Sequence, residues 1–227
     1  KCSGSTGDYS ITVNCGTASE SGTLKVLAAE KCFNVGDILF TDGTRIKAEQ
    51  AKYGVPDEKI TQAFAIIGSV SYGGATGLAV GLKQGSDLEW AASGSTGYNT
   101  NFEGIKVEYS WEGDSYTFTG DLDGSDNWEY ICSVDPEGTK NAEQNYPAFH
   151  FANTYSELVG LTGTKFEDGW YIPSIKELND VLNNKFDLGL DYFSRDGYYF
   201  LSSSQGYDYF AYVYMMGSRE LYVERYN

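Results

Sequence analysis

The carboxy-terminal segment, residues 192–226, is the part of the sequence that most restricts how the chain can fold. Of its 35 residues, 12 are aromatic and nine of these are tyrosines, whereas aromatic residues make up 15% of the whole chain. Two runs within it alternate between residue types with a period of two, which is typical of β-strands. We therefore expect the chain to end in a small antiparallel sheet.

The alternation predicts that this sheet has an aliphatic face and a tyrosine-rich face. In the first run, the aliphatic side holds Ala211, Val213 and Met215. The other side of that run holds Tyr212, Tyr214 and Met216. After a turn at Gly217 and Ser218, the second run continues the small apolar face with Leu221 and Val223. Its opposite face holds Glu220, Tyr222 and Glu224.

Two interpretations of the tyrosine-rich face are open. Tyrosine presents a large amphipathic ring at low cost in rotamer entropy, so an exposed row of it is suited to binding a ligand. Tyrosine also has a high strand propensity, so the same rings could pack beneath a loop without any binding role. The first interpretation predicts a recognition surface on the last strands, and the second predicts core.

Composition excludes several classes of function. The chain has 227 residues, 27 glycines and four prolines, with 21% charged residues, which is typical of a globular domain rich in loops and short strands. A net charge of −16 disfavours nucleic-acid binding, because lysine and arginine supply most of that affinity. No apolar run approaches the roughly 18 residues of a membrane span.

The four cysteines, at positions 2, 15, 32 and 132, do not form a zinc motif, since no CxxC spacing occurs and the chain has one histidine. A disulfide between Cys2 and Cys15, or between Cys15 and Cys32, is compatible with the spacing. Cys2 is also a candidate for lipid attachment at an outer cell surface, although Lys1 is not the small residue that such sites have before the cysteine. The sequence shows no signal peptide, so we expect that one was either never there or has been removed.

Local patterns along the chain predict an α+β fold with small mixed or antiparallel sheets, two main helices and much irregular loop. Strands are expected at residues 9–13, 24–27, 38–40, 63–70 and 77–82, the last two of them buried, and a hairpin at 106–119. Helices are expected after Pro56, at 127–134, at 141–161, where Pro147 must break or start the helix, and at 174–186. In the last of these, Ser174 and Glu177 form a capping box before an apolar stripe. We expect one continuous domain, with residues 1–34 as an extension and 192–227 as its final segment.

Several motifs resemble those of a known group of proteins. They are the segment GWYIPSIKEL at residues 169–178, then YFLSSSQ at 199–205, and Ala211-Tyr212-Val213. Four upstream blocks, at residues 35–44, 77–91, 93–100 and 124–139, extend the likeness. The chain resembles the C-type-lectin-like domains of the formylglycine-generating-enzyme branch, and in particular the variable proteins diversified by retroelements.

The resemblance implies a binding protein whose variable positions lie in the last strands and loops. In that group, variation arises at asparagine codons, and it cannot produce Met, Glu, Gln, Lys or Trp. Gln205, Met215, Met216, Glu220 and Glu224 are therefore expected to be fixed. The admissible ligand-binding positions are Tyr207, Asp208, Tyr209, Phe210, Tyr212, Tyr214, Ser218, Arg219 and Tyr222. The expected partner is a protein or another surface ligand, with no nucleic acid. The protein is expected at the cell surface, with no membrane span and with Cys2 as the candidate for a lipid anchor.

Enzymatic alternatives have weaker support. The formylglycine-generating enzymes use a late cysteine pair, and no cysteine follows Cys132. A serine–histidine mechanism would need His150, whose aromatic neighbours favour a packed side chain. The acids of residues 121–126 fit a solvated turn or a calcium loop, and we expect the turn, with no metal or cofactor. A hydrolase using two carboxylates on the same scaffold is the alternative function.

Overall fold

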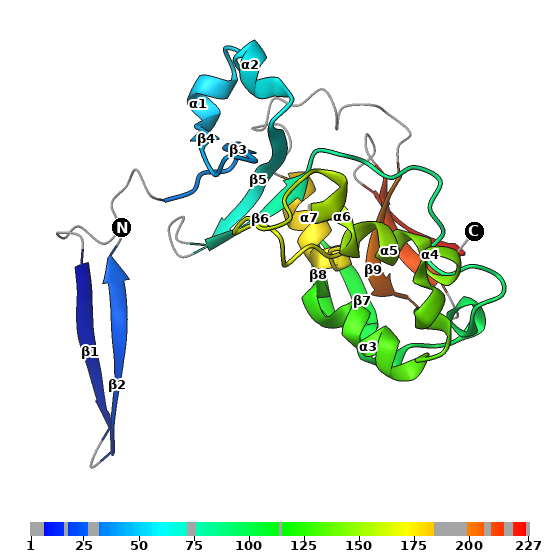
Figure 1. The fold of residues 1–227 in the computed structure, drawn as a ribbon. Helices are drawn as coiled ribbons and strands as arrows, with labels where there is room; N and C mark the ends of the chain where they lie inside the picture. The colour runs from blue at the N-terminus through cyan, green and yellow to red at the C-terminus, as the bar shows by residue number, and fades with distance from the viewer. Residues whose placement is uncertain are drawn as a thin grey trace.

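The structure is a computed structural model that describes residues 7–15, 18–26, 32–71, 76–113, 115–183, 199–206, 210–215 and 220–225. For residues 7–15, 18–26 and 220–225 it describes the backbone alone. The described chain is a mixed α/β fold with small antiparallel sheets and several short helices (Figure 1). The expected combination of helices with small sheets is therefore confirmed.

The first two strands form a hairpin of their own. β1 (Gly7–Cys15) pairs antiparallel with β2 (Ala18–Val26), and no other described strand joins this pair. β1 contains the strand predicted at residues 9–13, and β2 contains residues 24–26 of the strand predicted at 24–27. Figure 1 draws this hairpin apart from the remaining elements.

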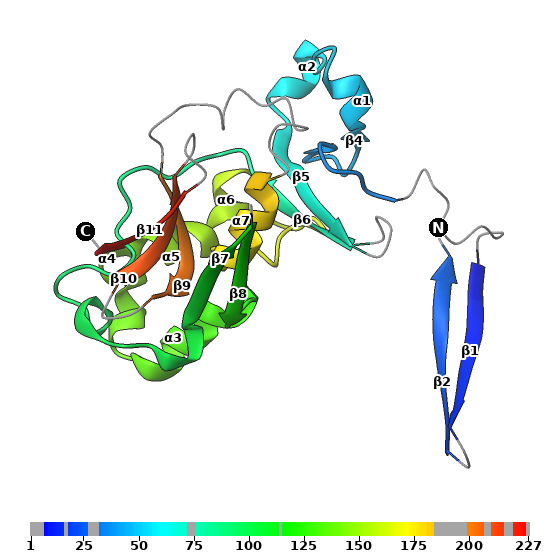
Figure 2. The same ribbon diagram turned by 180° about the vertical axis from the view of Figure 1, so that it is seen from behind.

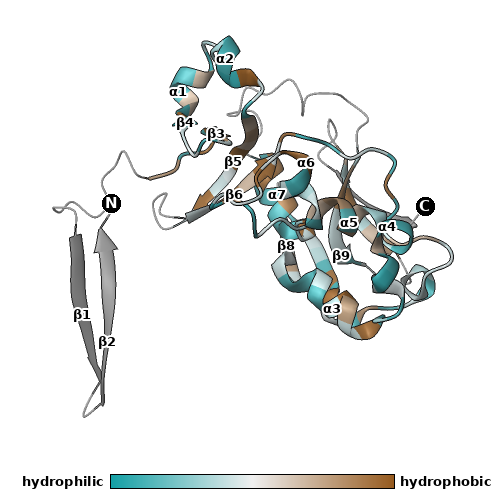
Figure 3. Cartoon of the chain, viewed as in Figure 1, coloured by the Kyte–Doolittle hydropathy of each residue, from teal (hydrophilic) through white to brown (hydrophobic). Residues whose placement is uncertain are grey.

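A four-stranded sheet follows, in the order β4-β3-β5-β6. Its strands are β3 (Ile38–Phe40), β4 (Arg45–Ile46), β5 (Ala63–Ser71) and β6 (Thr76–Gly81). The short helices α1 (Ala48–Ala51) and α2 (Asp57–Ile60) lie between β4 and β5, and Pro56 precedes α2 as predicted. β5 has a buried apolar stretch, visible as a continuous brown band in Figure 3.

The prediction that β6 is buried is wrong. Its residues are exposed or half-buried, because β6 is the edge strand of the sheet and pairs with β5 alone. An edge strand has no neighbour on its outer side to cover it. Gly77 and Gly81 nevertheless mark close approaches, since a Cβ on Gly81 would lie 2.5 Å from the Tyr155 ring.

The predicted hairpin and the helix after it are confirmed. β7 (Val107–Glu112) pairs antiparallel with β8 (Ser115–Gly120), and Gly113 in the turn has a positive φ of 66°. α3 (Asn127–Val134) begins and ends at the predicted residues, and Pro136 follows it.

The region predicted as one helix at 141–161 contains three short ones. They are α4 (Ala142–Asn145), α5 (Pro147–Asn153) and α6 (Tyr155–Leu158). Pro147 occupies the first turn of α5, where its missing N–H costs no hydrogen bond. α7 (Ile175–Asn183) is the helix led by the predicted capping box.

The carboxy-terminal sheet has the order β11-β10-β9. Its strands are β9 (Tyr199–Gln205), β10 (Phe210–Met215) and β11 (Glu220–Arg225), all antiparallel. β10 is therefore the central strand. Figure 2 shows the β7–β8 ribbon lying beside this sheet.

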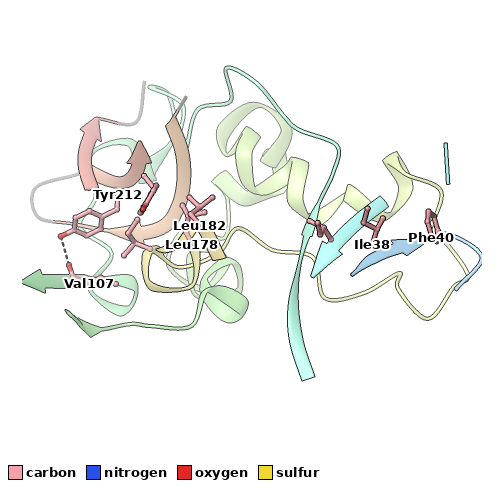
Figure 4. Packing of buried hydrophobic residues seen from close by; sticks show 9 residues of the cluster. Ile38, Phe40, Val107, Leu178, Leu182 and Tyr212 are labelled. Carbon is pink, nitrogen blue, oxygen red and sulfur yellow. Dashed lines mark hydrogen bonds between the residues drawn. The ribbon is translucent and has the colours of Figure 1, made fainter. Parts of the chain in front are cut away.

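The largest group of buried apolar side chains joins the two main sheets through α7. Ile38 and Phe40 come from the four-stranded sheet, Leu178 and Leu182 from α7, and Tyr212 from the carboxy-terminal sheet. Figure 4 shows Tyr212, Leu178 and Leu182 close together, with Ile38 and Phe40 farther away on the four-stranded sheet. The predicted apolar stripe of α7 is confirmed by the burial of Ile175, Leu178, Val181 and Leu182.

Candidate functional site

Strand β9 is held by hydrogen bonds from three consecutive buried serines. The Ser202 hydroxyl donates to the carbonyl of Tyr212 on β10 at 2.9 Å. The Ser203 hydroxyl accepts from the side-chain amide of Asn127 on α3 at 2.7 Å. The Ser204 hydroxyl accepts from the N–H of Ile175, the first residue of α7, at 2.9 Å. Each hydroxyl thus fixes β9 to a different element, and this satisfies polar groups that burial would otherwise penalise.

Gln205 continues this arrangement into the loop before β7. Its side chain is fully buried; Oε1 accepts from the N–H of Phe102 at 2.5 Å, and Nε2 donates to the carbonyl of Thr100 at 2.8 Å. The amide therefore supplies hydrogen-bond partners to backbone groups of the loop that runs beside the end of β9. This is a framework role, which agrees with the expectation that Gln205 is fixed.

The capping box before α7 is formed as predicted and reaches further than the helix. The Ser174 hydroxyl accepts from the Glu177 N–H at 3.2 Å, and the Glu177 carboxylate accepts from the Ser174 N–H at 3.0 Å. The same carboxylate accepts from the Gly124 N–H at 2.9 Å and from the Tyr171 hydroxyl at 2.8 Å. Burial and the Glu177 charge together raise the pKa of the Tyr171 phenol above its ordinary value.

Tyr212 and Tyr214 do not form the exposed face that the alternation predicts. Tyr212 is 3% exposed and Tyr214 is 1% exposed, and both belong to the core that includes α7. The Tyr212 hydroxyl donates to the Val107 carbonyl at 3.1 Å (Figure 4), and its ring meets Tyr109 edge-on at 5.7 Å. The prediction that these two side chains are exposed is therefore wrong.

The physical reason is that β10 is covered on both faces. Ala211, on the face opposite the tyrosines, packs into a second core that contains Trp90 and Phe149, and Val213 is also buried. On the tyrosine side, α7 and the β7–β8 ribbon provide the cover. Alternation separates two faces of a strand, but it does not determine whether another element lies against each of them.

The pairing of β10 with β11 also differs from the prediction. The backbone register places Tyr214 opposite Leu221, and Tyr212 opposite Val223. Directly paired residues of an antiparallel ladder share a face. Leu221 and Val223 therefore fall on the tyrosine face of β10, and Tyr222 falls on the face of Val213.

The other predicted ligand-binding positions have different outcomes. Phe210 begins β10 and is half-buried. Tyr222 lies in β11, where the structure describes the backbone alone. The remaining positions lie outside the described residues: Tyr207, Asp208, Tyr209, Ser218 and Arg219. The described part of the chain thus brings together Phe210, Tyr212 and Tyr214 on β10, with Tyr222 on the adjacent strand.

A partly exposed aromatic surface lies instead on the β7–β8 ribbon, although Tyr116 and Phe118 within it also pack against the core that contains Tyr212. One face of this ribbon holds Tyr109 and Trp111 from β7, opposite Phe118 and Tyr116 from β8. Trp111 is 55% exposed and Tyr109 is 40% exposed, and the Trp111 and Tyr116 ring centroids are 4.4 Å apart. We call these four residues the aromatic ribbon face. The hairpin was predicted from the sequence, but this face was not, although its aromatic residues occur at every second position.

The acids considered for metal binding bond to nearby turns. The Asp123 carboxylate accepts from the Ser125 N–H at 3.0 Å, and the Asp121 carboxylate accepts from the Asp123 N–H at 3.4 Å. Partial burial raises the pKa of Asp121. Within the described residues, no group of three or more His, Cys, Asp or Glu side chains could hold a metal ion.

The remaining candidates for chemistry lie on different segments of the chain. His150 lies half-buried on α5, beside the buried Phe149. Cys132 is a free thiol on α3, and partial burial raises its pKa, which disfavours the reactive thiolate. Cys2 lies outside the described residues, and the structure describes only the backbone of Cys15.

No protein-family model, curated protein or solved structure matches the chain. Among the described helices, none combines the length and the apolar character that crossing a bilayer requires. The function must therefore be argued from the geometry of the chain itself.

Proposed function

We propose that this protein is a non-enzymatic ligand-binding protein with a C-type-lectin-like fold, whose recognition residues flank the central strand β10. The observation that supports this most is the two-sided burial of β10, together with the bonded serines of β9. A binding site gains affinity when its support is rigid before the ligand arrives, because less conformational entropy is then lost.

The two segments that border β10 in the chain supply the proposed contact residues. Residues 207–209 connect β9 to β10, and residues 216–219 connect β10 to β11. They contain tyrosine, aspartate, serine and arginine, which combine large ring surfaces with hydrogen-bonding groups. The proposed recognition set is Tyr207, Asp208, Tyr209, Phe210, Ser218, Arg219 and Tyr222. Tyr212 and Tyr214 support this set from inside the fold.

The resemblance to the variable proteins diversified by retroelements supports this proposal. The motif that leads α7 and the serine-rich strand β9 are in contact through Ser204 and Ile175, so the two motifs act as one structural unit. In the variable proteins that the chain resembles, such a framework carries the diversified positions. We place the protein at an outer cell surface, with Cys2 as the proposed lipid-attachment residue; mass spectrometry of the protein from its native membrane would detect the lipid.

A pair of display libraries tests the proposed function. In the first, the seven proposed recognition positions are randomised on yeast and selected for binding to a purified target such as lysozyme. We expect most clones to reach the cell surface folded and target binders to be enriched after several rounds. The matched second library randomises Ser202, Gln205, Tyr212 and Tyr214, whose side chains are buried. We expect most of its clones to be lost from the surface.

The comparison between the libraries decides the outcome. If the first library loses folded clones as completely as the second, the proposed positions are framework and the proposal fails. Sequencing the DNA beside the gene gives a second test: a reverse-transcriptase gene and a repeat of the last coding region that differs at adenines would support a diversified surface.

A further inference from the structure

Strand β6 leaves one side of the four-stranded sheet without a partner. The sheet ends at β6, and among the described strands only β5 pairs with it. The Leu82 N–H donates to the Phe64 carbonyl at 2.9 Å, and in an antiparallel ladder such hydrogen-bonded pairs alternate with pairs that are not hydrogen-bonded. The backbone groups of Ala79 and Gly81 belong to the second kind of pair and point away from β5. Ala79 is also exposed, so its N–H and carbonyl are accessible to another strand.

The sequence of β6 has none of the features that usually protect an edge strand. Protected edges carry lysine, proline or an inward-pointing charge, or they are very short. β6 has six residues, TGLAVG, without a charge or a proline. β4, at the other end of the sheet, has two residues, and one of them is Arg45. The edge of β6 is therefore suited to accept an added strand through backbone hydrogen bonds.

The β1–β2 hairpin is an element that lacks support from the rest of the fold. No other described strand joins it, and Figures 1 and 2 draw it apart from the other elements. Apolar residues occupy every second position of β1, at Tyr9, Ile11 and Val13. The register places Tyr9 opposite Leu24 and Val13 opposite Glu20, so one face of the hairpin is largely apolar. Because a two-stranded hairpin alone is marginally stable, this one needs a third strand or a packed face.

We propose that β1 of one copy of this chain pairs with the open edge of β6 in a second copy, and that the two copies exchange hairpins reciprocally. Leu78 and Val80 are half-buried and share one face of β6, since residues two apart in a strand lie on the same side. When β1 pairs with β6, its apolar row continues this face. The contact gives β6 a second neighbour and gives the hairpin a third strand, and the apolar row fixes the register.

The connection from the hairpin to β3 favours a second copy over the hairpin's own chain. The Gly36 N–H donates to the Ile67 carbonyl of β5 at 2.8 Å, so the chain enters the sheet on the β3 side of β5. The open edge of β6 lies on the other side of β5. Phe64, Ala65 and Ile67 pack into one core, and Ile66 packs into the core on the opposite face. A hairpin that crossed β5 at these residues would displace one of the two cores.

The distribution of charge also favours a contact made by the hairpin. Residues 1–31 contain three lysines and three acidic residues, so the whole net charge of −16 belongs to residues 32–227. Two copies of the acidic part repel each other, whereas the neutral hairpin approaches a second copy without that cost. Salt screens the repulsion and leaves the apolar contact intact, so the exchanged dimer should become tighter as the salt concentration rises. The exchange does not require that the residues flanking β10 bind a ligand.

Sedimentation velocity of the full chain, from about 1 to about 100 µM, measures the assembly. We expect monomer to convert to dimer within this range. Ala79→Pro removes the outward N–H of β6, a position at which an edge strand tolerates proline, and should weaken the dimer about tenfold or more. Ala79→Ser keeps the N–H and is the matched control, which should assemble like the unaltered protein. Circular dichroism confirms that both variants are folded.

A second pair of variants tests the hairpin. Ile11→Asp with Val13→Asp places two charges in the apolar row of β1 and should abolish the dimer. Ser10→Asp with Thr12→Asp adds the same charge to the opposite face of the same strand and should leave most of the dimer in place. Equal loss in the two double variants would show that added charge, and not the apolar row, controls assembly, and would contradict the proposal.

Photo-cross-linking at position 79 identifies the strand beside β6 and does not depend on the proline variant. Ala79 is replaced by the photoreactive benzoylphenylalanine, and equal amounts of light protein and protein labelled with heavy nitrogen are mixed, irradiated and digested with trypsin. We expect links to the peptide of residues 2–25, which contains β1, and about half of them should join a light chain to a heavy one. The proposal is overturned if the chain stays monomeric throughout the concentration range, if Ala79→Pro and Ala79→Ser assemble alike, or if the links join only chains of the same label.

Discussion

Replacement of Tyr212 distinguishes a supporting role from a role in direct ligand contact. The Tyr212 side chain is buried, its hydroxyl donates to the Val107 carbonyl, and its ring contacts Tyr109 of the β7–β8 ribbon. An exposed contact residue could be replaced by alanine at almost no cost in stability. Tyr212 joins β10 to the ribbon, so its replacement by alanine should destabilise the fold. The replacement leaves a cavity and removes the hydroxyl that donates to the Val107 carbonyl.

The expected magnitudes follow from these contacts. Truncating a buried aromatic side chain to alanine costs about 3–5 kcal/mol, so Tyr212→Ala should lower the free energy of unfolding by that amount. For a chain of this size, 1 kcal/mol shifts the melting temperature by about 2–4 °C, so the expected decrease is roughly 6–20 °C. Tyr212→Phe removes the hydrogen bond alone and should cost about 1–2 kcal/mol.

Urea denaturation monitored by circular dichroism measures these changes, with melting temperatures from calorimetry as a second estimate. Tyr53→Ala serves as the control, because Tyr53 is 85% exposed, and it should change the free energy of unfolding by less than about 0.5 kcal/mol. A loss below about 1 kcal/mol for Tyr212→Ala would refute the reasoning. Such a result would indicate that the Tyr212 side chain is exposed, as the alternation predicts.

Three further predictions concern other parts of the framework. Gln205→Ala removes the partners of the Phe102 N–H and the Thr100 carbonyl, and should cost about 2–3 kcal/mol in urea denaturation; a change within experimental error would show that the loop does not need this amide. Gly81→Ala places a methyl group against the Tyr155 ring, whose hydroxyl donates to the Phe64 carbonyl, and should lower the free energy of unfolding by about 1–3 kcal/mol. The control Gly94→Ala, with open space around the new methyl group, should be tolerated. Burial raises the phenol pKa values of Tyr146, Tyr155 and Tyr171 above the ordinary value of 10.0, so stability should be intact below about pH 10 and fall as the pH rises further; urea midpoints that stay constant from about pH 9 to about pH 11 would contradict this.

Local structure is where the sequence was most informative. The capping box at Ser174 and Glu177, the apolar stripe of α7 and the bounds of α3 all follow from patterns within a few residues. Two strands of the carboxy-terminal sheet, β10 and β11, were also predicted, because period-two alternation is a local property, whereas β9 was not predicted as a strand. The split of residues 141–161 into three helices was only partly indicated, through Pro147.

The faces of β10 could not be determined in the same way, because they depend on elements distant in sequence. Val107, which accepts the Tyr212 hydrogen bond, is 105 residues away. One signal was nevertheless present: β10 reads Phe210–Met215 without a single charged residue, and a short continuous apolar run is typical of a strand buried on both faces. Aromatic and small residues alternate in β10, and this alternation was interpreted as one exposed face and one buried face. Both residue types are largely apolar, so the alternation does not indicate an exposed face.

The aromatic ribbon face was missed for the opposite reason. Its residues alternate with exposed glutamate, serine and threonine, which is the pattern of a ribbon with one apolar face. That pattern usually indicates a face packed on the core, and the base of the ribbon fits this expectation. Only the tertiary structure shows that the ribbon extends outward, so that Trp111 and Tyr109 are left exposed.

The central claim is that the tyrosines of β10 support the recognition surface from within. Hydroxyl-radical footprinting with mass spectrometry measures the solvent accessibility of each tyrosine side chain in the intact protein. The structure predicts that Tyr212 and Tyr214 are protected from oxidation, while Tyr53 reacts rapidly and Tyr109 at an intermediate rate. Oxidation of Tyr212 and Tyr214 as fast as Tyr53 would contradict the account and make these rings the recognition surface.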